Sequence, residues 1–595
     1  MTPPISPGNL NDPWTPAAQP ATVAALTEMA PDPVPAAAPD APYSPLESRK
    51  HQMFPILSAH DISRIERFGE RRSYASGDVL YHQGRPGPGL FVILEGEVQI
   101  ITRDGLGHVS VVVEQGAGQF MAEVGQLSGK PALVEGIALS AVEVWLVSPE
   151  HLRALLVAEA DLGERIMRAL ILRRVGLIEK GRGLVLVGGE ASGRLHNLQS
   201  FLRRNAYPHA VMQADEDADI KLLLERITPK ASEYPLVICP DGTVLRAPDE
   251  GELATHLGLL PDFDPQHVYD VAVVGAGPAG LAAAVYAASE GLSVAVFECR
   301  APGGQAGASS RIENYLGFPT GISGQALAGR AFVQAQKFGA HLAIPLEVKA
   351  LHCQESPLQL ELRDGRRIPT RTVVVASGAV YRRPRIEHLE RFEGRGVYYW
   401  ASPVEAKLCR DEEVMLVGGG NSAGQAAVFL ATHAKRVHIV IRAADFSASM
   451  SRYLIERIES QPNISMHVRS EICGLIGDDH GLTGVAYQTH ADDGQLDVAT
   501  LNVRHLFLFI GADPNTDWLR DCDVEIDNKG FVPTGAAVAT QASGPDYALQ
   551  TSVRGVFAIG DVRSGSTKRV AAAVGEGAGV VAQIHAYLAQ AVTTA

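Results

Sequence analysis

Two glycine loops constrain this chain most strongly. The first reads Val-Gly-Ala-Gly-Pro-Ala-Gly at residues 274–280, and the second reads Val-Gly-Gly-Gly-Asn-Ser-Ala at residues 417–423. Each loop ends an apolar run and precedes small residues typical of a helix. Because such a strand–turn–helix unit binds a dinucleotide pyrophosphate, two of them predict two Rossmann-like domains. Two dinucleotides in one chain suit electron transfer from a nicotinamide to a flavin.

The length and charge of the chain exclude several classes of protein. Its 595 residues are too many for one core, and length alone predicts roughly four domains. A net charge of -15 without a basic block argues against nucleic acid as a partner. No apolar run reaches the ~18–20 residues of a membrane helix, and the first residues lack the pattern of a signal peptide. We therefore expect a cytoplasmic protein with no membrane partner.

The six cysteines are scattered along the sequence. No two of them lie within three residues of each other. This spacing argues against a Cys-x-x-Cys redox centre, a zinc knuckle or a disulfide framework. We therefore predict no metal site.

Two regions precede the glycine loops. Residues 1–46 are rich in Pro and Ala and predict a disordered tail. Residues 47–180 contain short β-rich runs separated by Gly and then leucine-rich helices, which indicates a β-roll domain. Residues 78–84, 93–98 and 120–138 resemble the cyclic-nucleotide-binding domain.

The resemblance implies a phosphate-binding cassette. In that family a Glu contacts the ribose hydroxyl, and an Arg nine positions later pairs with the phosphate. Glu123 matches the Glu, but Ala132 stands at the Arg position, and Lys130 is close in sequence. Losing such a contact costs about two decades of affinity. A docking or regulatory module is therefore preferred over ordinary cyclic AMP binding, although a cyclic nucleotide or another ligand stays open as a partner.

Residues 183–262 resemble the thioredoxin/glutaredoxin fold. The expected order is strand, helix, strand, helix, two strands and a last helix, with Pro235 at the position of that family's cis-proline. The family's dithiol belongs at residues 190–195, where this sequence has no thiol. Cys239 follows Pro235 on a strand and is interpreted as a packed, inert cysteine.

The first glycine loop predicts an FAD-binding domain at residues 266–383 and 509–595. Gly275 allows the tight turn, Gly277 the approach of the pyrophosphate, and Gly280 close packing of the helix on the strand. Glu298, after the second strand, can accept hydrogen bonds from the ribose hydroxyls. This half of the chain resembles the low-molecular-weight thioredoxin reductases. That resemblance implies FAD contacts at Gly275, Gly277, Pro278, Ala279, Gly280, Glu298, Gly304, Gln305, Asn314, Ala376, Gly378, Gly560, Asp561, Lys568, Arg569 and Val570.

The second glycine loop predicts a nicotinamide-binding domain at residues 384–508. Its expected cofactor contacts are Gly418, Gly420, Asn421, Ser422, Ala423 and Arg442. The NADPH-dependent family members carry an arginine cluster after the second strand of this domain. Here Arg442 stands without the further arginines, so NADPH is favoured over NADH and both stay open.

The family's catalytic Cys-x-x-Cys is missing from its place. The Gly-Arg-Gly-Val segment that precedes it is present at residues 394–397, but Trp400 and Pro403 stand where the two sulfurs belong. Cys409 is the first thiol that follows, and we interpret it as an inert structural cysteine.

The sequence thus predicts an α/β multidomain protein. Two Rossmann-like domains follow a β-roll domain and a small thioredoxin-like α/β domain. The expected function is an NAD(P)H-dependent FAD oxidoreductase of the thioredoxin-reductase-like type that passes hydride to FAD and electrons to a quinone, oxygen or a small redox protein. No catalytic acid or base is expected, because the cofactors supply the chemistry. A sensing flavoprotein with little turnover, and a reductase that uses a partner's thiols, are the alternatives. The resemblance also implies a homodimer.

Overall fold

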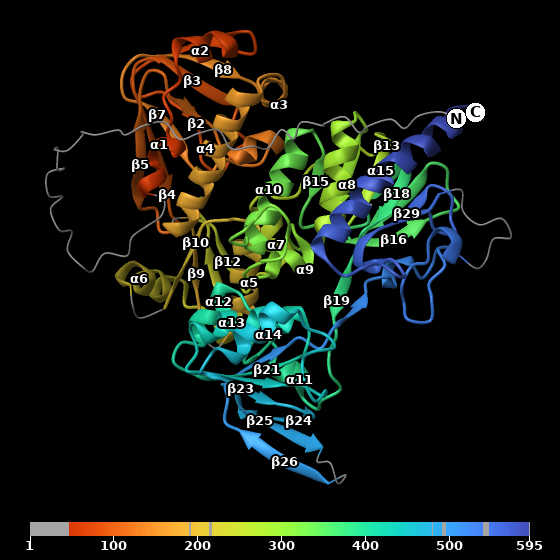
Figure 1. Ribbon diagram of the computed structural model, residues 1–595. Helices are drawn as coiled ribbons and strands as arrows, with labels where there is room; N and C mark the ends of the chain where they lie inside the picture. Colours follow the sequence, from red (N-terminus) through yellow and green to blue (C-terminus); the bar gives the residue numbers. More distant parts are fainter. Residues whose placement is uncertain are drawn as a thin grey trace, which may run out of the picture. The chain divides into compact units, whose positions relative to one another are not determined.

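The computed structural model describes residues 47–593, apart from 182, 190–191, 214–216, 479, 491–494 and 539–546. The expected tail at 1–46 lies outside the described residues. Arg49–Ala595 form one compact unit, whose helices and strands are labelled in Figure 1. Of the helices that the structure describes, none combines the length and the apolar character of a membrane span.

The first domain is a roll of two four-stranded antiparallel sheets, ordered β1-β8-β3-β6 and β2-β7-β4-β5. The turn after β3 requires Gly96, because its φ is +86° and an added Cβ would lie 2.2 Å from Ala141 O. Tyr81 and Phe91 stack inside the roll with ring centroids 5.8 Å apart. The strands are β1 (Glu70–Tyr74), β2 (Val79–Tyr81), β3 (Leu90–Glu95), β4 (Val98–Arg103), β5 (Val109–Gln115), β6 (Phe120–Met121), β7 (Glu135–Ala138) and β8 (Val142–Val147). The helices are α1 (Lys50–Met53), α2 (Ala59–Glu66), α3 (Pro149–Ala158) and α4 (Ala160–Glu179).

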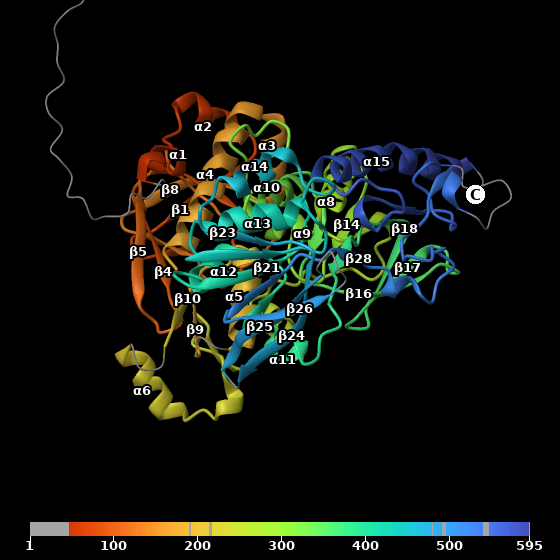
Figure 2. The ribbon, with the colours of Figure 1, turned by 60° about the horizontal axis from the view of Figure 1, so that its bottom comes forward.

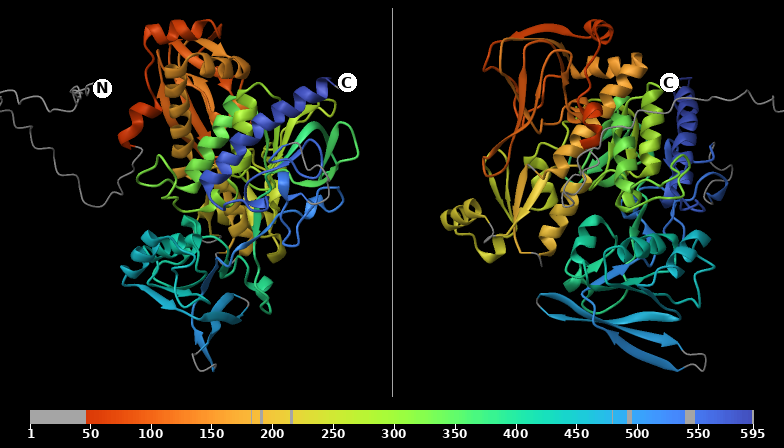
Figure 3. Two further views of the ribbon diagram at one scale, coloured as in Figure 1. Left: turned by 45° about the vertical axis from the view of Figure 1, so that its right-hand side comes forward. Right: turned by 60° about the vertical axis from the view of Figure 1, so that its left-hand side comes forward.

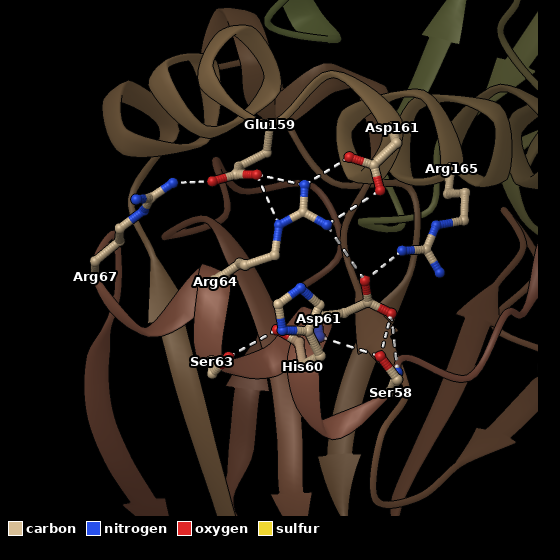
Figure 4. Close-up of polar contacts among 9 residues, drawn as sticks. All are labelled: Ser58, His60, Asp61, Ser63, Arg64, Arg67, Glu159, Asp161 and Arg165. Carbon is tan, nitrogen blue, oxygen red and sulfur yellow. Dashed lines mark hydrogen bonds and ion pairs between the residues drawn. The ribbon is translucent and has the colours of Figure 1, made fainter.

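A polar network joins α2 to the junction of α3 and α4 (Figure 4). Arg64 contacts the carboxylates of Glu159 and Asp161 at that junction. Asp61 accepts a hydrogen bond from Arg165. Burial opposes the charge of Asp61, but its hydrogen bonds lower its pKa to about 2. The carboxylate therefore stays ionised at neutral pH and keeps α2 attached to the two helices.

The second domain is a small mixed sheet, ordered β10-β9-β11-β12. β10 is parallel to β9, whereas β11 is antiparallel to both β9 and β12. The Tyr234–Pro235 peptide bond is cis, as the resemblance of this segment predicts. The elements are β9 (Leu184–Val187), α5 (Gly193–Arg204), β10 (His209–Met212), α6 (Ala218–Ile227), β11 (Leu236–Ile238), β12 (Val244–Arg246) and α7 (Glu250–His256).

The third domain is built on a seven-stranded sheet, ordered β15-β14-β13-β18-β17-β16, with β29 also paired to β18. Its parallel strands are nearly all apolar because both faces are covered. Helices α8, α10 and α15 pack on one face, and α8 and α15 lie against each other (Figure 2). The elements are β13 (Tyr269–Val274), α8 (Pro278–Ser289), β14 (Val294–Phe297), α9 (Gly304–Ala308), α10 (Gly324–Lys337), β15 (His341–Ala343), β16 (Val348–His352), β17 (Leu358–Leu362), β18 (Arg367–Val375), β29 (Val556–Ala558) and α15 (Val570–Thr593).

The fourth domain is inserted between β18 and β29 in the sequence. It has a parallel sheet, ordered β20-β27-β21-β22-β23, and an antiparallel sheet of β24, β25 and β26. The three-stranded sheet lies at the lower end of both views in Figure 3. The elements are α11 (Leu389–Phe392), β20 (Val397–Tyr398), α12 (Pro403–Leu408), β21 (Glu413–Val417), α13 (Asn421–Ala431), β22 (Arg436–Val440), α14 (Arg452–Glu459), β23 (Ile464–His467), β24 (Ser470–Asp478), β25 (Gly481–His490), β26 (Leu496–Leu501) and β27 (His505–Leu508).

A two-stranded ribbon connects the inserted domain to the third domain. β19 (Ala379–Tyr381) pairs with β28 (Ala512–Pro514) in antiparallel register. The pairing continues into the insertion, because Arg382 N donates to Gly511 O at 3.0 Å. Both connections therefore run side by side, at the two segments that a hinge between the domains would use.

Candidate functional site

The first glycine loop forms a cradle between β13 and α8. An added Cβ at Gly275 would lie 2.2 Å from Ala376 O, and one at Gly280 would lie 1.9 Å from Gly275 O. Both glycines are therefore required by the protein's own packing. Gly277 differs, because an added Cβ there would meet no atom within 4 Å. The loop thus leaves open space at the position where a dinucleotide pyrophosphate fits.

Two distant segments meet this cradle. Gly303 N donates to Ala276 O at 2.7 Å, and an added Cβ at Gly304 would lie 3.1 Å from Gly277 Cα. From the C-terminal part, an added Cβ at Gly560 would lie 2.8 Å from the Ala279 side chain. The three segments therefore surround one site, which is the arrangement that a bound FAD needs.

The polar residues expected around the flavin are distributed around these segments. Glu298 follows β14, and its carboxylate accepts a hydrogen bond from Ala276 N at 3.0 Å. Burial raises the pKa of Asp561, so hydroxyl donors of a ligand would favour its charged form. Lys568 Nζ donates to Asp561 O at 2.5 Å.

The remaining expected FAD contacts differ in how they are held. Gln305 Nε2 donates to Ala379 O at 2.5 Å, which fixes its side chain at the start of the ribbon. Asn314 is exposed, and Arg569 is exposed directly before α15. Positions Ala376 and Gly378 follow β18, Pro278 begins α8 and Val570 begins α15.

The second glycine loop lies between β21 and α13. An added Cβ at Gly418 would lie 2.4 Å from Phe509 O, whereas one at Gly420 would meet no atom within 4 Å. Asn421 Oδ1 accepts a hydrogen bond from Ser451 N at 2.7 Å and closes the side of the loop. This loop therefore repeats the pattern of the first, with one glycine fixed by packing and one facing open space.

The other expected nicotinamide contacts lie on either side of this loop. Ser422 is exposed in the first turn of α13, and Ala423 is buried behind it. Arg442 is exposed just beyond the end of β22. Ser422 and Arg442 are therefore both open to solvent.

A fully buried carboxylate, Glu405, lies beside Trp400 in the first turn of α12. Trp400 Nε1 donates to Glu405 Oε1 at 2.9 Å, and His196 Nε2 of α5 lies 3.0 Å from the same oxygen. Glu405 is fully buried. Burial opposes its charge, but the contacts with His196 and Ser402 lower its pKa. The sequence did not point to Glu405 or His196, because a single Glu in a short helix carries no pattern.

A cavity of about 220 Å³ is lined by His196 and Trp400, the two side chains that contact this carboxylate. Aromatic rings form much of its wall, and the Arg300 guanidinium lies over the Trp400 ring at 5.5 Å. Its lining residues are His196, Asn197, Glu393, Gly394, Val397, Tyr398, Tyr399 and Trp400. The second and fourth domains therefore share one polar and aromatic site.

All six cysteines are free thiols. Cys409 is fully buried at the end of α12, and burial raises its pKa. Burial also raises the pKa of Cys239 to about 12. Both thiols are therefore protonated at neutral pH and poorly suited to exchange chemistry.

In the β-roll, one oxygen of the buried Glu123 carboxylate is bonded to the protein's own backbone. Glu123 Oε1 accepts hydrogen bonds from Leu133 N at 2.9 Å and Val134 N at 3.1 Å. Arg174 Nη1 lies 3.8 Å from the other carboxylate oxygen. Ala132 is buried. The Glu123 carboxylate thus already accepts two backbone hydrogen bonds when no ligand is bound.

The comparisons with known proteins agree with this arrangement. Residues 269–577, more than half of the chain, match the model of the pyridine nucleotide-disulphide oxidoreductase family, and residues 71–159 match that of the cyclic nucleotide-binding domain. Thioredoxin reductase of Mycoplasmopsis pulmonis is 32% identical over 311 residues, which cover 52% of this chain and 94% of that protein. NADPH-dependent thioredoxin reductase 3 of Arabidopsis thaliana is 31% identical over 326 residues, which cover 54% of this chain and 58% of that protein. A crystal structure of Lactococcus lactis thioredoxin reductase matches with a TM-score of 0.49 and 26% identity. The match covers 54% of this chain and 99% of that protein.

The thioredoxin reductase family uses FAD and NADPH, and both glycine loops have the open position that these cofactors require. The chain therefore belongs to the pyridine nucleotide-disulphide oxidoreductase family and is an NAD(P)H-dependent flavin oxidoreductase of the thioredoxin-reductase-like type, with a cyclic-nucleotide-binding domain in its N-terminal part.

Proposed function

We propose that this oxidoreductase works without a redox-active disulfide and passes electrons from FAD directly to an acceptor. The observation that carries the proposal is the Trp400–Glu405–His196 contact at the place of the disulfide. The first thiol that follows, Cys409, is buried and protonated. With no dithiol to receive electrons here, a quinone, oxygen or a small redox protein is the acceptor class that fits.

The cofactor contacts follow from the two loops. Bound FAD supplies the chemistry, since it accepts a hydride from a nicotinamide and yields electrons to an acceptor. The backbone at Gly277 and Glu298 would hold the FAD, and the backbone at Gly420 would hold the nicotinamide dinucleotide. Arg442 favours NADPH over NADH, although a single Arg binds a 2′-phosphate less tightly than a cluster does.

Two roles are proposed for the front half of the chain. Residues 183–262 would be a thioredoxin-like module without a dithiol, because their strand order β10-β9-β11-β12 agrees with that fold. An added Cβ at Gly193, the first residue of α5, would lie 3.3 Å from Arg395 Cγ, so α5 begins against the segment that precedes Trp400. This module and the β-roll would regulate the flavin domains or dock a partner, in a cytoplasmic homodimer.

Rapid mixing of the flavin-loaded protein with NADPH or NADH tests the main proposal. We expect bleaching of the flavin band within seconds, followed by turnover with a quinone or with oxygen. We expect no reduction of a disulfide dye through added thioredoxin. A flavin that neither nucleotide reduces would support a sensing flavoprotein instead, and thioredoxin-dependent activity would support a reductase that uses a partner's thiols.

Calorimetry with cyclic AMP and cyclic GMP tests the β-roll. We expect no binding tighter than micromolar, because Ala132 lacks the cation that pairs with the phosphate and Glu123 already accepts two backbone hydrogen bonds. Loss of such a charge-assisted bond costs about 1.5–3 kcal/mol. Submicromolar affinity for either nucleotide would refute this assignment.

A further inference from the structure

Two cysteines far apart in the sequence meet in the FAD-binding domain. Cys353 directly follows β16, and Cys522 follows the short helical turn Asp517–Leu519. β16 packs against that turn, and both cysteines contact the same apolar core on the side of the sheet away from α8. Both are half-buried and have exposed neighbours, Gln354 and Asp523. Part of each cysteine residue is therefore in contact with solvent.

Contacts between the two segments bring the two cysteines together. The side chains of Cys353 and Cys522 interact with each other, and the Cys522 thiol donates to Leu519 O at 3.2 Å. The Gln354 side chain also donates to the Asp523 carboxylate, which joins the residues that follow the two cysteines.

The surroundings make the two sulfurs unequal. The contact with Cys353 lowers the pKa of Cys522, against the effect of its burial. The same contact, together with burial, raises the pKa of Cys353. A lowered pKa and an adjacent second thiol are the two features of an attacking and a resolving cysteine.

We propose that Cys353 and Cys522 form a thiol–disulfide exchange site that reacts with low-molecular-weight disulfides, separate from the flavin chemistry. The Cys522 thiolate attacks one sulfur of the small disulfide, forms a mixed disulfide and releases the first thiolate. Cys353 then loses its proton and attacks the Cys522 sulfur, which releases the second thiolate. The protein dithiol loses two electrons and two protons, and the small disulfide becomes two thiols.

A disulfide between Cys353 and Cys522 would change the stability of the protein. The inserted domain lies between the two cysteines in the sequence, whereas both sulfurs lie in the FAD-binding domain. A bond between them would close the chain around the whole insertion. Because a cross-link between distant residues restricts the unfolded chain most, we expect oxidation to raise the unfolding temperature.

Oxidised glutathione is the probe for the test. The full-length, flavin-loaded protein is reduced, desalted under nitrogen, incubated with a series of glutathione redox buffers, alkylated and digested for mass spectrometry. We expect a peptide that links Cys353 to Cys522 in the oxidising buffers and its loss on return to reducing buffers. The absence of this peptide at every ratio, with glutathione adducts elsewhere, would overturn the proposal.

Single variants separate the two roles. Cys353→Ser should accumulate glutathione on Cys522, because no thiol is left to resolve the mixed disulfide. Cys522→Ser should leave Cys353 at least tenfold slower to react at neutral pH.

Cys473→Ser, which removes an exposed cysteine of the inserted domain, is the matched control and should not change the cross-link. The visible flavin spectrum reports whether each variant is folded, and alanine variants replace any serine variant that is not. Equal reaction rates of Cys353 and Cys522 would refute their assignment as resolving and attacking thiols.

Discussion

Gly277→Val should yield a folded protein that has lost FAD. The φ of Gly277 is -70° and an added Cβ meets no protein atom within 4 Å, so the backbone accepts the larger residue. The valine side chain instead fills the space that the pyrophosphate requires. We expect FAD affinity to fall by at least about two decades, equivalent to ~2.8 kcal/mol. The ratio of absorbance at the flavin band to that of the protein measures this directly.

Two further variants control this result. Gly329→Val in α10 also places a side chain where no atom lies within 4 Å, and it should keep its FAD. Gly280→Ala should lose both FAD and stability, because the added Cβ would lie 1.9 Å from Gly275 O. If Gly277→Val retains a full complement of FAD, the first loop is not the pyrophosphate site.

Glu405→Gln should strongly destabilise the protein. The fully buried carboxylate accepts hydrogen bonds from Trp400 Nε1 at 2.9 Å and Ser402 N at 2.7 Å, and the loss of a hydrogen bond to a charged group costs about 1.5–3 kcal/mol. Chemical denaturation at pH 7 measures the loss. Glu459→Gln, at an exposed position of α14, is the control and should change stability by less than ~0.5 kcal/mol.

The effect of pH gives an independent test of the same carboxylate. The folded pKa of Glu405 is lowered from 4.5, so its charged form stabilises the protein fully above that value. This contribution is lost as pH falls through the lower folded pKa. The difference in stability between wild type and Glu405→Gln should therefore shrink in acid. A difference that stays constant from pH 7 to pH 3 would show that charge is not the cause.

The sequence predicted the glycine loops best, because their requirements are local. Gly280 is fixed by Gly275 O within one strand–turn–helix unit, and such units leave a spacing in the sequence, whereas the contact of Gly275 with Ala376 O comes from a distant segment. The end of a helix is less well determined. The sequence predicts a helix after the loop at residues 274–280, whereas α8 already begins at Pro278, because proline without an N–H fits the first helical position.

The contacts between distant segments were not predictable. His196 lies in α5 and Glu405 in the short helix α12 of a different domain, and no periodicity links them. The Cys353–Cys522 pair depends on how β16 packs against a turn that follows the inserted domain. A rule based on cysteine spacing detects sulfurs that are close in sequence, and it misses sulfurs that only the tertiary fold brings together.

The β19–β28 ribbon has a consequence for how such enzymes diversify. Since Arg382 N donates to Gly511 O, the chain leaves and re-enters the FAD-binding domain at neighbouring points. A short turn could join these points into a hairpin without moving the strands on either side. The whole nicotinamide domain is thus an exchangeable cassette. A lineage could replace it, and change the electron donor, while the flavin site stays intact.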